Sequence, residues 1–391
     1  MQAMSATPSG ARSMRDRWLA WRDRLLASRS FQRAAAAFPL TAPIARKRAS
    51  ELFNLVAGFV YSQVLLACVQ LRLFDTLAEG PQTIGELSAR LCLPVASTER
   101  LIAAAEALKL VEARGGGRFG LGTLGAPMVG NTAITAMIEH HASLYADLRD
   151  PVALLRGEET SSSSLARYWP YADAPAPGAL TAASVQAYSA LMTASQPLVA
   201  DEILDAYPLS RHRCLLDVGG GEGAFVLRAA TRAPRLRLVL FDLPAVADRA
   251  RARCAASDVG GRVQIVGGSF LSDALPKGAD VASLVRVIHD HDDAAALRIL
   301  RAVREALTPG GTLLLAEPMA GTPGAQAMGN AYFGFYLLAM GRGRPRTAKA
   351  LRSLLHAAGF ECVRPVPTRM PLQTSLLVAR TPIASAPGSG V

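Results

Sequence analysis

The stretch that decides the fold runs Leu215-Leu-Asp-Val-Gly-Gly-Gly-Glu-Gly-Ala-Phe225. Its apolar start predicts a strand that ends in Asp217, and its glycines predict a tight turn into a helix. Glycines at the carboxyl end of such a strand let a ligand approach the backbone closely. About 20 residues further on, the apolar run 238–241 ends in Asp242, an acid that can bind the two hydroxyls of a ribose. Together the two motifs predict a nucleoside ligand at one edge of an α/β sheet.

Three features decide between the ligands that use such a turn. A dinucleotide site has the same geometry, but Asp217 beside the glycines would repel a pyrophosphate, whereas it suits a ligand with an ammonium group. The segment 308–318, Thr-Pro-Gly-Gly-Thr-Leu-Leu-Leu-Ala-Glu-Pro, follows a helix as in methyltransferase sheets. A strand with a histidine lies between the glycine turn and this segment. These features favour S-adenosylmethionine, and a dinucleotide-dependent oxidoreductase is the alternative.

That histidine lies in Val281-Ala-Ser-Leu-Val-Arg-Val-Ile-His-Asp-His-Asp-Asp293. The strand is predicted to run to Ile288, so that His289 falls at its carboxyl end, where open α/β sheets bind ligands. An imidazole near its ordinary pKa is largely neutral at pH 7 and can accept a proton from a hydroxyl group. His291 is expected to face solvent and to take no direct part.

The N-terminal half of the chain predicts a helical region that begins near residue 51. The run 83–91 predicts a helix, Ser97 or Thr98 is expected to cap a second helix over 99–110, and 111–121 predicts a hairpin with a glycine turn. This order is typical of a winged helix. The pI of 9.9 requires nucleic-acid binding to be considered. The second helix, however, mixes acids with bases on an otherwise apolar surface, so no nucleic-acid partner is expected.

Most of the net charge of +11 lies at the start of the chain. Ten Arg and Lys residues and only two Asp residues precede Ser50. In this arm Trp18, Trp21 and Leu25 recur at helical spacing, a pattern that suits contact with an anionic membrane surface. The alternative is a solvated arm whose Trp side chains pack on its own domain. No signal peptide is expected, and five scattered cysteines without a C-x-x-C pair predict a cytoplasmic protein.

The segment Leu52–Leu71 carries no charge and is long enough to span a membrane. Polar residues and a glycine interrupt it, which a single spanning helix would bear only at a cost. We therefore expect a helix buried in protein at a subunit interface.

The glycine turn, Phe-Asp-Leu-Pro at 241–244, Gly-Gly-Ser-Phe at 267–270, Ile-His-Asp-His-Asp-Asp at 288–293 and the segment 308–318 occur in a familiar order. In this order they resemble the small-molecule O-methyltransferases of the caffeate and acetylserotonin type. The resemblance implies a doubly wound, Rossmann-like class I methyltransferase domain after a mainly helical, winged-helix-like domain that dimerises. It divides the chain into an arm (1–50), a dimerisation domain (51–182), a cofactor-binding domain (183–380) and a disordered tail (381–391).

The resemblance also implies roles for single residues. It makes His289 the general base and Glu317 a carboxylate beside it. Two positions depart from the family pattern: Ser269 stands where Asp is usual, and Pro345 stands where a second carboxylate is usual. Glu317 alone, or with the help of Asp290, would then orient the histidine. The residues implied for the cofactor are Asp217, Gly219, Gly221, Asp242, Leu243, Gly268, Ser269, Phe270 and Arg286.

The sulfonium methyl group of S-adenosylmethionine is already activated, so the reaction needs alignment of three atoms and no metal. The arm, the segment 52–71, and the runs 165–172 and 340–347 resemble the carotenoid-pathway members of the family, the hydroxyneurosporene or demethylspheroidene O-methyltransferases. This implies an apolar hydroxylated acceptor. A phenol, a polyketide or a tetrapyrrole stays open, as does a non-catalytic regulator that keeps the fold. The expected pocket residues are Met192, Met328, Tyr332, Phe335 and Tyr336.

Overall fold

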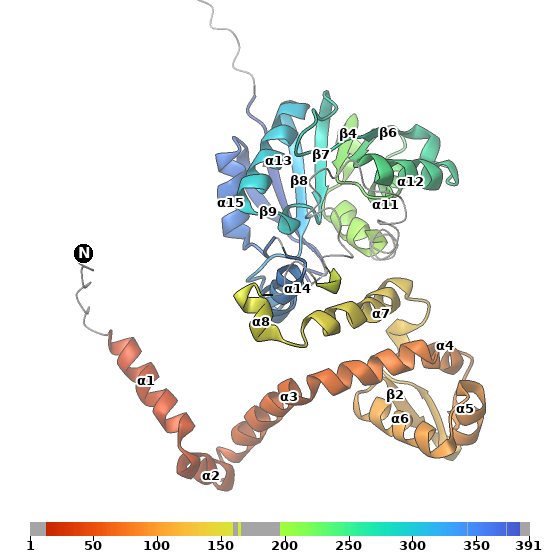
Figure 1. Ribbon diagram of the computed structural model, residues 1–391, viewed down its shortest axis with the longest axis vertical. Coiled ribbons are helices and arrows are strands. Elements are labelled where there is room, and N and C mark those ends of the chain that lie inside the picture. Colours follow the sequence, from red (N-terminus) through yellow and green to blue (C-terminus); the bar gives the residue numbers. More distant parts are fainter. Residues whose placement is uncertain (1–12, 159–162, 166–195, 342, 373, 384–391) are drawn as a thin grey trace, which may run out of the picture. The chain divides into compact units, whose positions relative to one another are not determined.

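The computed structural model describes residues 13–158, 163–165, 196–341, 343–372 and 374–383 (Figure 1). The chain divides into two compact units, Met1–Val129 and Gly130–Val391. The domain boundary predicted at residues 182 and 183 lies outside the described residues, and so does most of the tail predicted at 381–391.

The first unit consists of three consecutive helices followed by a small winged-helix element. The three strands of this element form an antiparallel sheet in the order β1-β3-β2. The winged helix that the sequence predicts is therefore confirmed. The elements are α1 (Met14–Ala27), α2 (Arg29–Ala37), α3 (Ala42–Gln70), α4 (Leu73–Ala78), β1 (Gln82–Thr83), α5 (Ile84–Leu91), α6 (Val95–Ala107), β2 (Val111–Arg114) and β3 (Arg118–Leu121).

The two helices of the winged element begin for different reasons. α5 begins with a capping box, in which Thr83 and Glu86 each accept a hydrogen bond from the backbone N–H of the other. The start predicted for the next helix, at Ser97 or Thr98, is wrong. α6 already begins after Pro94, and the buried Thr98 hydroxyl donates to the Pro94 carbonyl within the first turn.

α3 is the longest helix among the described residues, and most of its surface is open in the single chain. By length and composition it could cross a membrane: its most apolar 18 residues have a mean hydropathy of 1.9, and 11% of them are buried. Only Ala42, Cys68 and Val69 are buried in this helix. The burial that the sequence predicts for this segment is thus not supplied by the described residues of its own chain. Within residues 52–71, the large apolar side chains that are exposed are Leu52, Phe53, Leu55, Val56, Phe59 and Val60.

The second unit is built on one seven-stranded sheet with the order β6-β5-β4-β7-β8-β10-β9. The first five strands in this order are parallel, and β10 is antiparallel to both of its neighbours. The predicted doubly wound α/β fold is confirmed. The strands are β4 (Cys214–Val218), β5 (Arg237–Asp242), β6 (Val263–Gly267), β7 (Ala279–Val285), β8 (Leu307–Glu317), β9 (Glu361–Val366) and β10 (Ser375–Arg380). The helices are α7 (Thr132–Asp147), α8 (Pro151–Arg156), α11 (Ala224–Arg232), α12 (Pro244–Ala255), α13 (Asp293–Ala306), the π-helix η8 (Ala327–Tyr332), α14 (Phe333–Ala339), α15 (Ala348–Ala357) and the helical residues 196–206.

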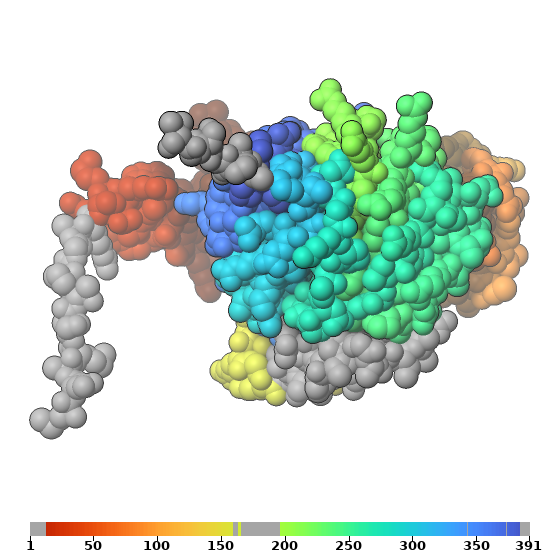
Figure 2. Space-filling model, turned by 90° about the horizontal axis from the view of Figure 1, so that it is seen from above, coloured from red at the N-terminus to blue at the C-terminus, as the bar shows by residue number. Residues whose placement is uncertain are grey.

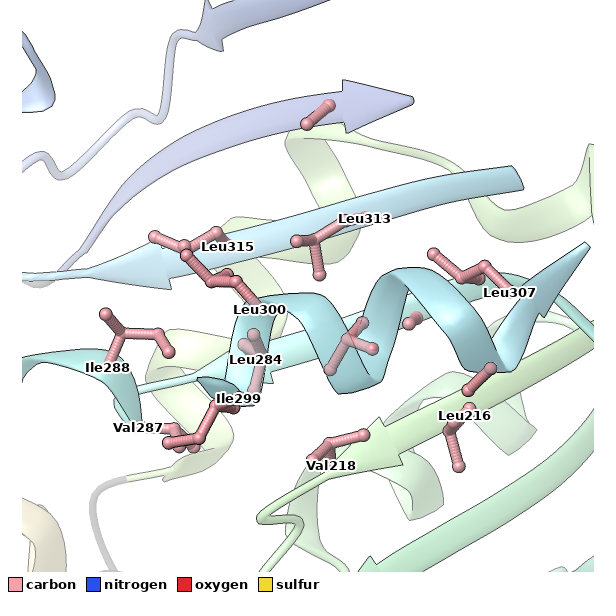
Figure 3. Packing of buried hydrophobic residues seen from close by; sticks show 14 of the residues in the cluster. Leu216, Val218, Leu284, Val287, Ile288, Ile299, Leu300, Leu307, Leu313 and Leu315 are labelled. Carbon is pink, nitrogen blue, oxygen red and sulfur yellow. The ribbon is translucent and has the colours of Figure 1, made fainter. Parts of the chain in front are cut away.

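Helices cover both faces of this sheet because alternate strand residues point to opposite sides. On one face, α13 and α15 pack on alternate leucines of β4, β7 and β8, and Figure 3 shows Ile299 and Leu300 of α13 in this layer. On the other face, α11 and residues 199–204 pack on the intervening residues of the same strands. Segments far apart in the sequence, green and blue in Figure 2, therefore form one continuous surface of this unit.

α7 and α8 belong to the second unit although the sequence assigned them to the dimerisation domain. They contact α14. Leu144 of α7 and Leu154 of α8 share a buried cluster with Leu337 and Met340 of the α14 region. The chain therefore changes from one unit to the other before α7, at Val129 and Gly130.

Candidate active site

The strand order of the large sheet reverses between β4 and β7, and such a reversal opens a crevice at the carboxyl ends of the strands. Asp217 of β4 lies beside Ser283 of β7 in the ladder, and the Ser283 hydroxyl donates to Asp217 Oδ1 at 2.6 Å. The carboxylate is 1% exposed. Among the described residues, its other oxygen, Oδ2, has no hydrogen-bond partner. An unsatisfied buried acceptor of this kind indicates a ligand with a donor or a positive charge.

The pKa of Asp217 also indicates a ligand with a positive charge. Burial raises the pKa of this carboxyl to about 7, the hydrogen bond from Ser283 opposes the rise, and the charge of Asp242 adds to it. A cationic group near Oδ2 would favour the ionised carboxylate and lower its pKa again. The crevice therefore contains an acid that is complementary to an ammonium or sulfonium group.

The turn after β4 depends on glycine at each step. Gly219 and Gly221 have positive φ angles of 70° and 57°. A Cβ atom on Gly220 would lie 2.7 Å from Asp217 Oδ2, whereas one on Gly221 would meet no atom within 4 Å. The turn is thus tight against Asp217 and open at Gly221, which is the arrangement a closely approaching ligand needs.

Asp242 closes the neighbouring strand β5, and the backbone around it fixes its side chain. Its Oδ2 accepts the N–H of Gly221 and its Oδ1 accepts the N–H of Leu243, both at 2.7 Å. Burial raises the pKa of Asp242 to about 6, against the lowering effect of these two N–H groups. Because each carboxylate oxygen has a second lone pair, the group can still accept hydrogen bonds from a diol.

The loop after β6 is tied to Asp242 and contains a carboxylate that the sequence analysis missed. The N–H of Gly268 donates to the Asp242 carbonyl at 2.9 Å, and a Cβ on Gly268 would lie 2.7 Å from the ring of Phe241. The N–H of Ser269 donates to the carboxylate of Asp273 at 2.8 Å. The acid of this loop is therefore four residues beyond the position where the family has it, and no motif singled it out.

Phe270 connects this loop to the histidine segment. Its ring meets the ring of His291 edge to face, with the centroids 5.4 Å apart. The expectation that His291 faces solvent is wrong, because its side chain is partly buried in this contact. Burial lowers the pKa of His291, against the opposing charge of Asp290.

His289 lies in a short 3₁₀ turn, not at the end of a strand as predicted. β7 stops at Val285, because Arg286 has a positive φ of 59° that a strand cannot continue, and the turn covers Ile288–Asp290. The Arg286 N–H still donates to the carbonyl of Ala316 on β8. The prediction of the strand end is wrong by three residues, yet the turn keeps the histidine at the carboxyl edge of the sheet.

Two carboxylates hold His289 in different ways. Its ring nitrogen Nε2 lies 3.1 Å from Asp290 Oδ1, and both side chains are at most 7% exposed. Glu317, the last residue of β8, accepts the backbone N–H of His289 at 2.9 Å. Of the two carboxylates that the sequence offered, Asp290 contacts the ring and Glu317 anchors the backbone. Within the described part of the chain, the remaining ring nitrogen, Nδ1, is buried without a hydrogen-bond partner.

Opposing effects set the basicity of His289. Burial alone lowers its pKa, but the charge and the hydrogen bond of Asp290, together with the charge of Glu317, raise it above the ordinary value despite the charge of Arg286. Burial also raises the pKa of Glu317, while His289 lowers it. The arrangement therefore favours a proton on the imidazole more than water does.

An aromatic cluster extends from His289 to α7. The ring of Phe333 lies 6.0 Å from the ring of His289, and Tyr332 meets Phe333 edge to face at 5.1 Å. Tyr332 stacks on Tyr336 with a centroid distance of 5.9 Å. Tyr332 ends the π-helix η8, an irregularity that often marks functional sites.

Two histidines of α7 complete this cluster, and the sequence analysis did not single them out. His140 Nε2 lies 2.9 Å from the Tyr336 hydroxyl, and His141 Nε2 lies 2.8 Å from the Tyr332 hydroxyl. Burial, followed by the charge of His141, lowers the pKa of His140 to about 4. Burial lowers the pKa of His141 as well. Both imidazoles are therefore neutral at pH 7.

The structure brings the predicted cofactor residues to one edge of the sheet. The predicted pocket residues do not all lie in one place. Tyr332 and Tyr336 lie in the aromatic cluster. Met328 and Phe335 are partly buried on η8 and α14. Met192 lies outside the described residues.

The residues present fit S-adenosylmethionine. Asp217 offers a buried, unsatisfied oxygen to the positively charged part of the donor, and Asp242 offers a carboxylate fixed by two N–H groups to the ribose. The Gly221 backbone lies open between them. A pyrophosphate would have to come close to two carboxylates, which is unfavourable.

Comparison with known families agrees with this assignment. The O-methyltransferase domain family matches residues 146–361, and the O-methyltransferase dimerisation domain matches residues 53–135. The chain is similar to the demethylspheroidene O-methyltransferases of Cereibacter sphaeroides (43% identity, 92% of this chain and 94% of the relative) and Rhodobacter capsulatus (39%, 87% and 84%).

The solved structures show the same fold. The SAH-bound methyltransferase of calicheamicin biosynthesis matches with a TM-score of 0.71 and 28% identity, over 86% of this chain and 98% of that structure. The prediction of an O-methyltransferase is therefore confirmed, and the oxidoreductase alternative is not supported. The chain belongs to the O-methyltransferase family, in which S-adenosylmethionine is the methyl donor.

Proposed function

We propose that the chain methylates a hydroxyl group of a long apolar acceptor, a 1-hydroxycarotenoid such as demethylspheroidene, in carotenoid biosynthesis. The observation that carries the proposal is the 43% identity to a demethylspheroidene O-methyltransferase over 92% of the chain. Because the dimerisation domain begins only at residue 53, a match of that extent includes part of the N-terminal arm. The likeness therefore goes beyond the residues that serve the cofactor.

The cofactor would be held by the residues at the carboxyl ends of β4, β5 and β7. Asp217 would face the ammonium group, Asp242 would accept the ribose hydroxyls, and Gly219 and Gly221 would let the ligand approach the turn. Bound S-adenosylmethionine supplies an electrophilic methyl carbon on a sulfonium, which needs no further activation. The loop 268–270 and Arg286 would line the same site.

His289 would act as the general base through Nδ1, the ring nitrogen that does not face Asp290. The nearby carboxylate would hold the proton on Nε2 and stabilise the imidazolium that forms when the acceptor hydroxyl loses its proton. Glu317 would keep the turn in place through the backbone of His289. An aliphatic alcohol is a much weaker acid than a phenol, with a pKa near that of water. Proton removal would therefore accompany methyl transfer.

The aromatic cluster would form part of the acceptor wall. In the pairs His140–Tyr336 and His141–Tyr332 the polar atoms bond to each other, so the side chains can offer mainly ring surface to an apolar acceptor. Phe333 would lie next to the reacting hydroxyl, because its ring neighbours His289. The expected pocket residues Met192, Met328 and Phe335 stay proposals of the same kind.

The proposal includes a homodimer. The dimerisation domain matches from residue 53, within α3. Leu52, Leu55, Val56 and Phe59 form an exposed apolar stripe at helical spacing on this helix. A second copy of the chain would cover this stripe and supply the burial that the sequence predicts.

The arm would contact an anionic membrane surface. Trp18 is 57% exposed and Trp21 is 54% exposed on the basic helix α1. A cytoplasmic enzyme with such an arm would stay at the inner face of the membrane, where a bilayer-dissolved acceptor accumulates.

The test is a transfer assay with the full chain and methyl-labelled S-adenosylmethionine. The acceptor panel contains hydroxycarotenoids in detergent micelles, the same polyenes without the hydroxyl, and phenols of similar size. We expect label only in the hydroxycarotenoids. Transfer to the phenols with none to the hydroxycarotenoids would replace the proposed acceptor class.

A further inference from the structure

A buried arginine to which no role has been assigned so far contacts the turn that carries His289. The Arg346 side chain is 1% exposed. Its Nη1 donates to the Ile288 carbonyl at 2.8 Å, and its Nη2 donates to the His291 carbonyl at 2.6 Å. These two carbonyls lie immediately before and immediately after the pair His289–Asp290. One guanidinium group thus spans the whole turn.

The main chain next to Arg346 supports the same turn. The backbone N–H of Arg344 donates to the His289 carbonyl at 2.9 Å. Gly343, with φ of 85°, passes so close to the turn that a Cβ would overlap the backbone of His289 and Asp290. We call residues 343–346 the brace. Because only glycine fits at its first position, the brace and the turn are built to lie in contact.

Two further contacts hold Arg346, the last residue of the brace, in place. Arg346 Nε donates to Asp293 Oδ1 at 2.9 Å, at the start of α13. The Arg346 carbonyl accepts the N–H of Ala320, shortly after β8. The guanidinium fork is rigid and planar, so three fixed acceptors determine its position. A lysine could not replace it, because one nitrogen cannot reach both carbonyls and the carboxylate.

We infer that Arg346 is a positioning residue of this methyltransferase, which fixes the 288–291 turn so that the Asp290 carboxylate stays on the His289 ring. The inference rests on the proposed role of His289 as the base. Pro345 stands where the family has a second carboxylate, so this position cannot hold the histidine directly. Here the same segment supports the 288–291 turn through the Arg346 side chain and through its own backbone. Arg346 touches neither reactant in this account.

The charged and titratable groups around His289 determine how its pKa would change without the brace. Asp290 and His291 lie on its own turn, Glu317 faces it from β8, and Arg286 faces it from the end of β7. Arg346 also contributes a positive charge that lowers the pKa of Glu317. Asp290 is the largest influence that raises the pKa of His289, opposed by burial. If the turn relaxes and Asp290 leaves the ring, the pKa of His289 falls.

The test compares Arg346→Gln and Arg346→Lys with Arg344→Gln. The last is a matched control, because the exposed Arg344 side chain pairs with the same Asp293 while its backbone N–H is unaffected by substitution. The measurements are kcat and KM for the acceptor across pH and the affinity for S-adenosylhomocysteine. A base must be neutral to act, so activity falls as pH drops through the pKa of His289.

We expect both Arg346 variants to lose turnover on the order of 10²-fold, as for a small misplacement of a reacting group. The acidic limb of their pH profile should move to lower pH, while S-adenosylhomocysteine affinity stays at the wild-type value. Arg344→Gln should lose far less turnover and keep the limb in place. If Arg346→Gln does not fold, Arg346→Lys, which keeps the charge, carries the same expectation.

Folded Arg346 variants with wild-type turnover and an unmoved acidic limb would overturn the inference. An equal loss of cofactor affinity and turnover would also overturn it, because that result indicates a general structural role. His289→Gln, measured in parallel, distinguishes a failure of the inference about Arg346 from a failure of the proposed role of His289 as the base. If His289→Gln keeps its turnover, the base assignment fails, whatever the Arg346 variants do.

Discussion

At the scale of single residues, the site combines a buried acid, Asp217, and a partly buried acid, Asp242, both held by hydrogen bonds within the chain. Asp217 uses one oxygen on Ser283, and Asp242 uses both oxygens on backbone N–H groups. Such preorganisation reduces the cost of binding, because the acids already point into the crevice before the ligand arrives.

Asp242→Ala should weaken S-adenosylhomocysteine binding. The change removes hydrogen bonds from the ribose to a charged acceptor, worth about 1.5–3 kcal/mol, and it also releases the Gly221 turn. Calorimetric titration of the purified protein measures the effect. Asp248→Ala is the control, because that exposed carboxylate on the neighbouring helix pairs only with Arg251 among the contacts described. An affinity equal to wild type in Asp242→Ala would place the ribose elsewhere.

The motif residues could be found from the sequence because each lies at the end of an apolar run. Asp242 and Glu317 close their strands and Asp217 is the next-to-last residue of its strand, and parallel strands bring their carboxyl ends to one edge. Contacts between distant segments gave no such signal. Arg346 and His140 reach the site from segments whose local pattern is that of an ordinary loop and an ordinary helix.

At the scale of elements, the misplaced boundaries have local causes. The strand β7 seemed to continue to Ile288 because residues 284–288 are mostly apolar, but the positive φ of Arg286 turns the chain. α6 begins earlier than the Ser and Thr residues suggested, because Pro94 fits at a helix start. The sequence assigned α7 to the dimerisation domain, whereas it packs on α8 and α14, because an apolar helix face does not reveal which element covers it.

The apolar stripe of α3 predicts how the dimer can be disrupted. Leu55→Glu combined with Phe59→Glu would place two charges in the proposed interface. We expect the dimer Kd to rise more than about 100-fold, since two buried charges without partners cost at least 3 kcal/mol. Light scattering over a concentration series measures the mass.

Asn54→Glu is the control for this double variant. It adds a charge to the same helix, on a side away from Leu52, Leu55 and Phe59, and should leave the mass unchanged. A wild-type chain that is monomeric at micromolar concentration without detergent would contradict the proposed interface. Partition into detergent does not bear on this question, because the arm alone could cause it.

At the scale of the whole molecule, the proposed function gives each part of the chain a role: membrane contact for the arm, dimerisation for the first unit and catalysis for the second. If the acceptor dissolves in lipid as proposed, an arm that binds the membrane would bring the enzyme to the phase that holds its substrate. The two compact units explain why the family domains match separate stretches, 53–135 and 146–361.

The arm predicts binding to anionic vesicles. The full chain should sediment with vesicles of phosphatidylserine and phosphatidylcholine, and much less with phosphatidylcholine alone, since each basic residue near such a surface contributes about 1 kcal/mol. Trp18→Ala with Trp21→Ala should weaken the binding without changing the charge, and salt should weaken it in the wild type. Equal sedimentation with both kinds of vesicle, or with neither, would remove the membrane from the account.

His289 is proposed to take the proton from the acceptor hydroxyl, and the variant His289→Gln is the decisive experiment for this role. Turnover and S-adenosylhomocysteine affinity are measured on the same preparation, with His356→Gln on the distant helix α15 as the control. We expect a loss of turnover of about 10²–10⁴-fold, as for the removal of a positioned base, with unchanged cofactor affinity. Near-normal turnover in His289→Gln would contradict it, because alignment of the reactants alone would then be sufficient for methyl transfer.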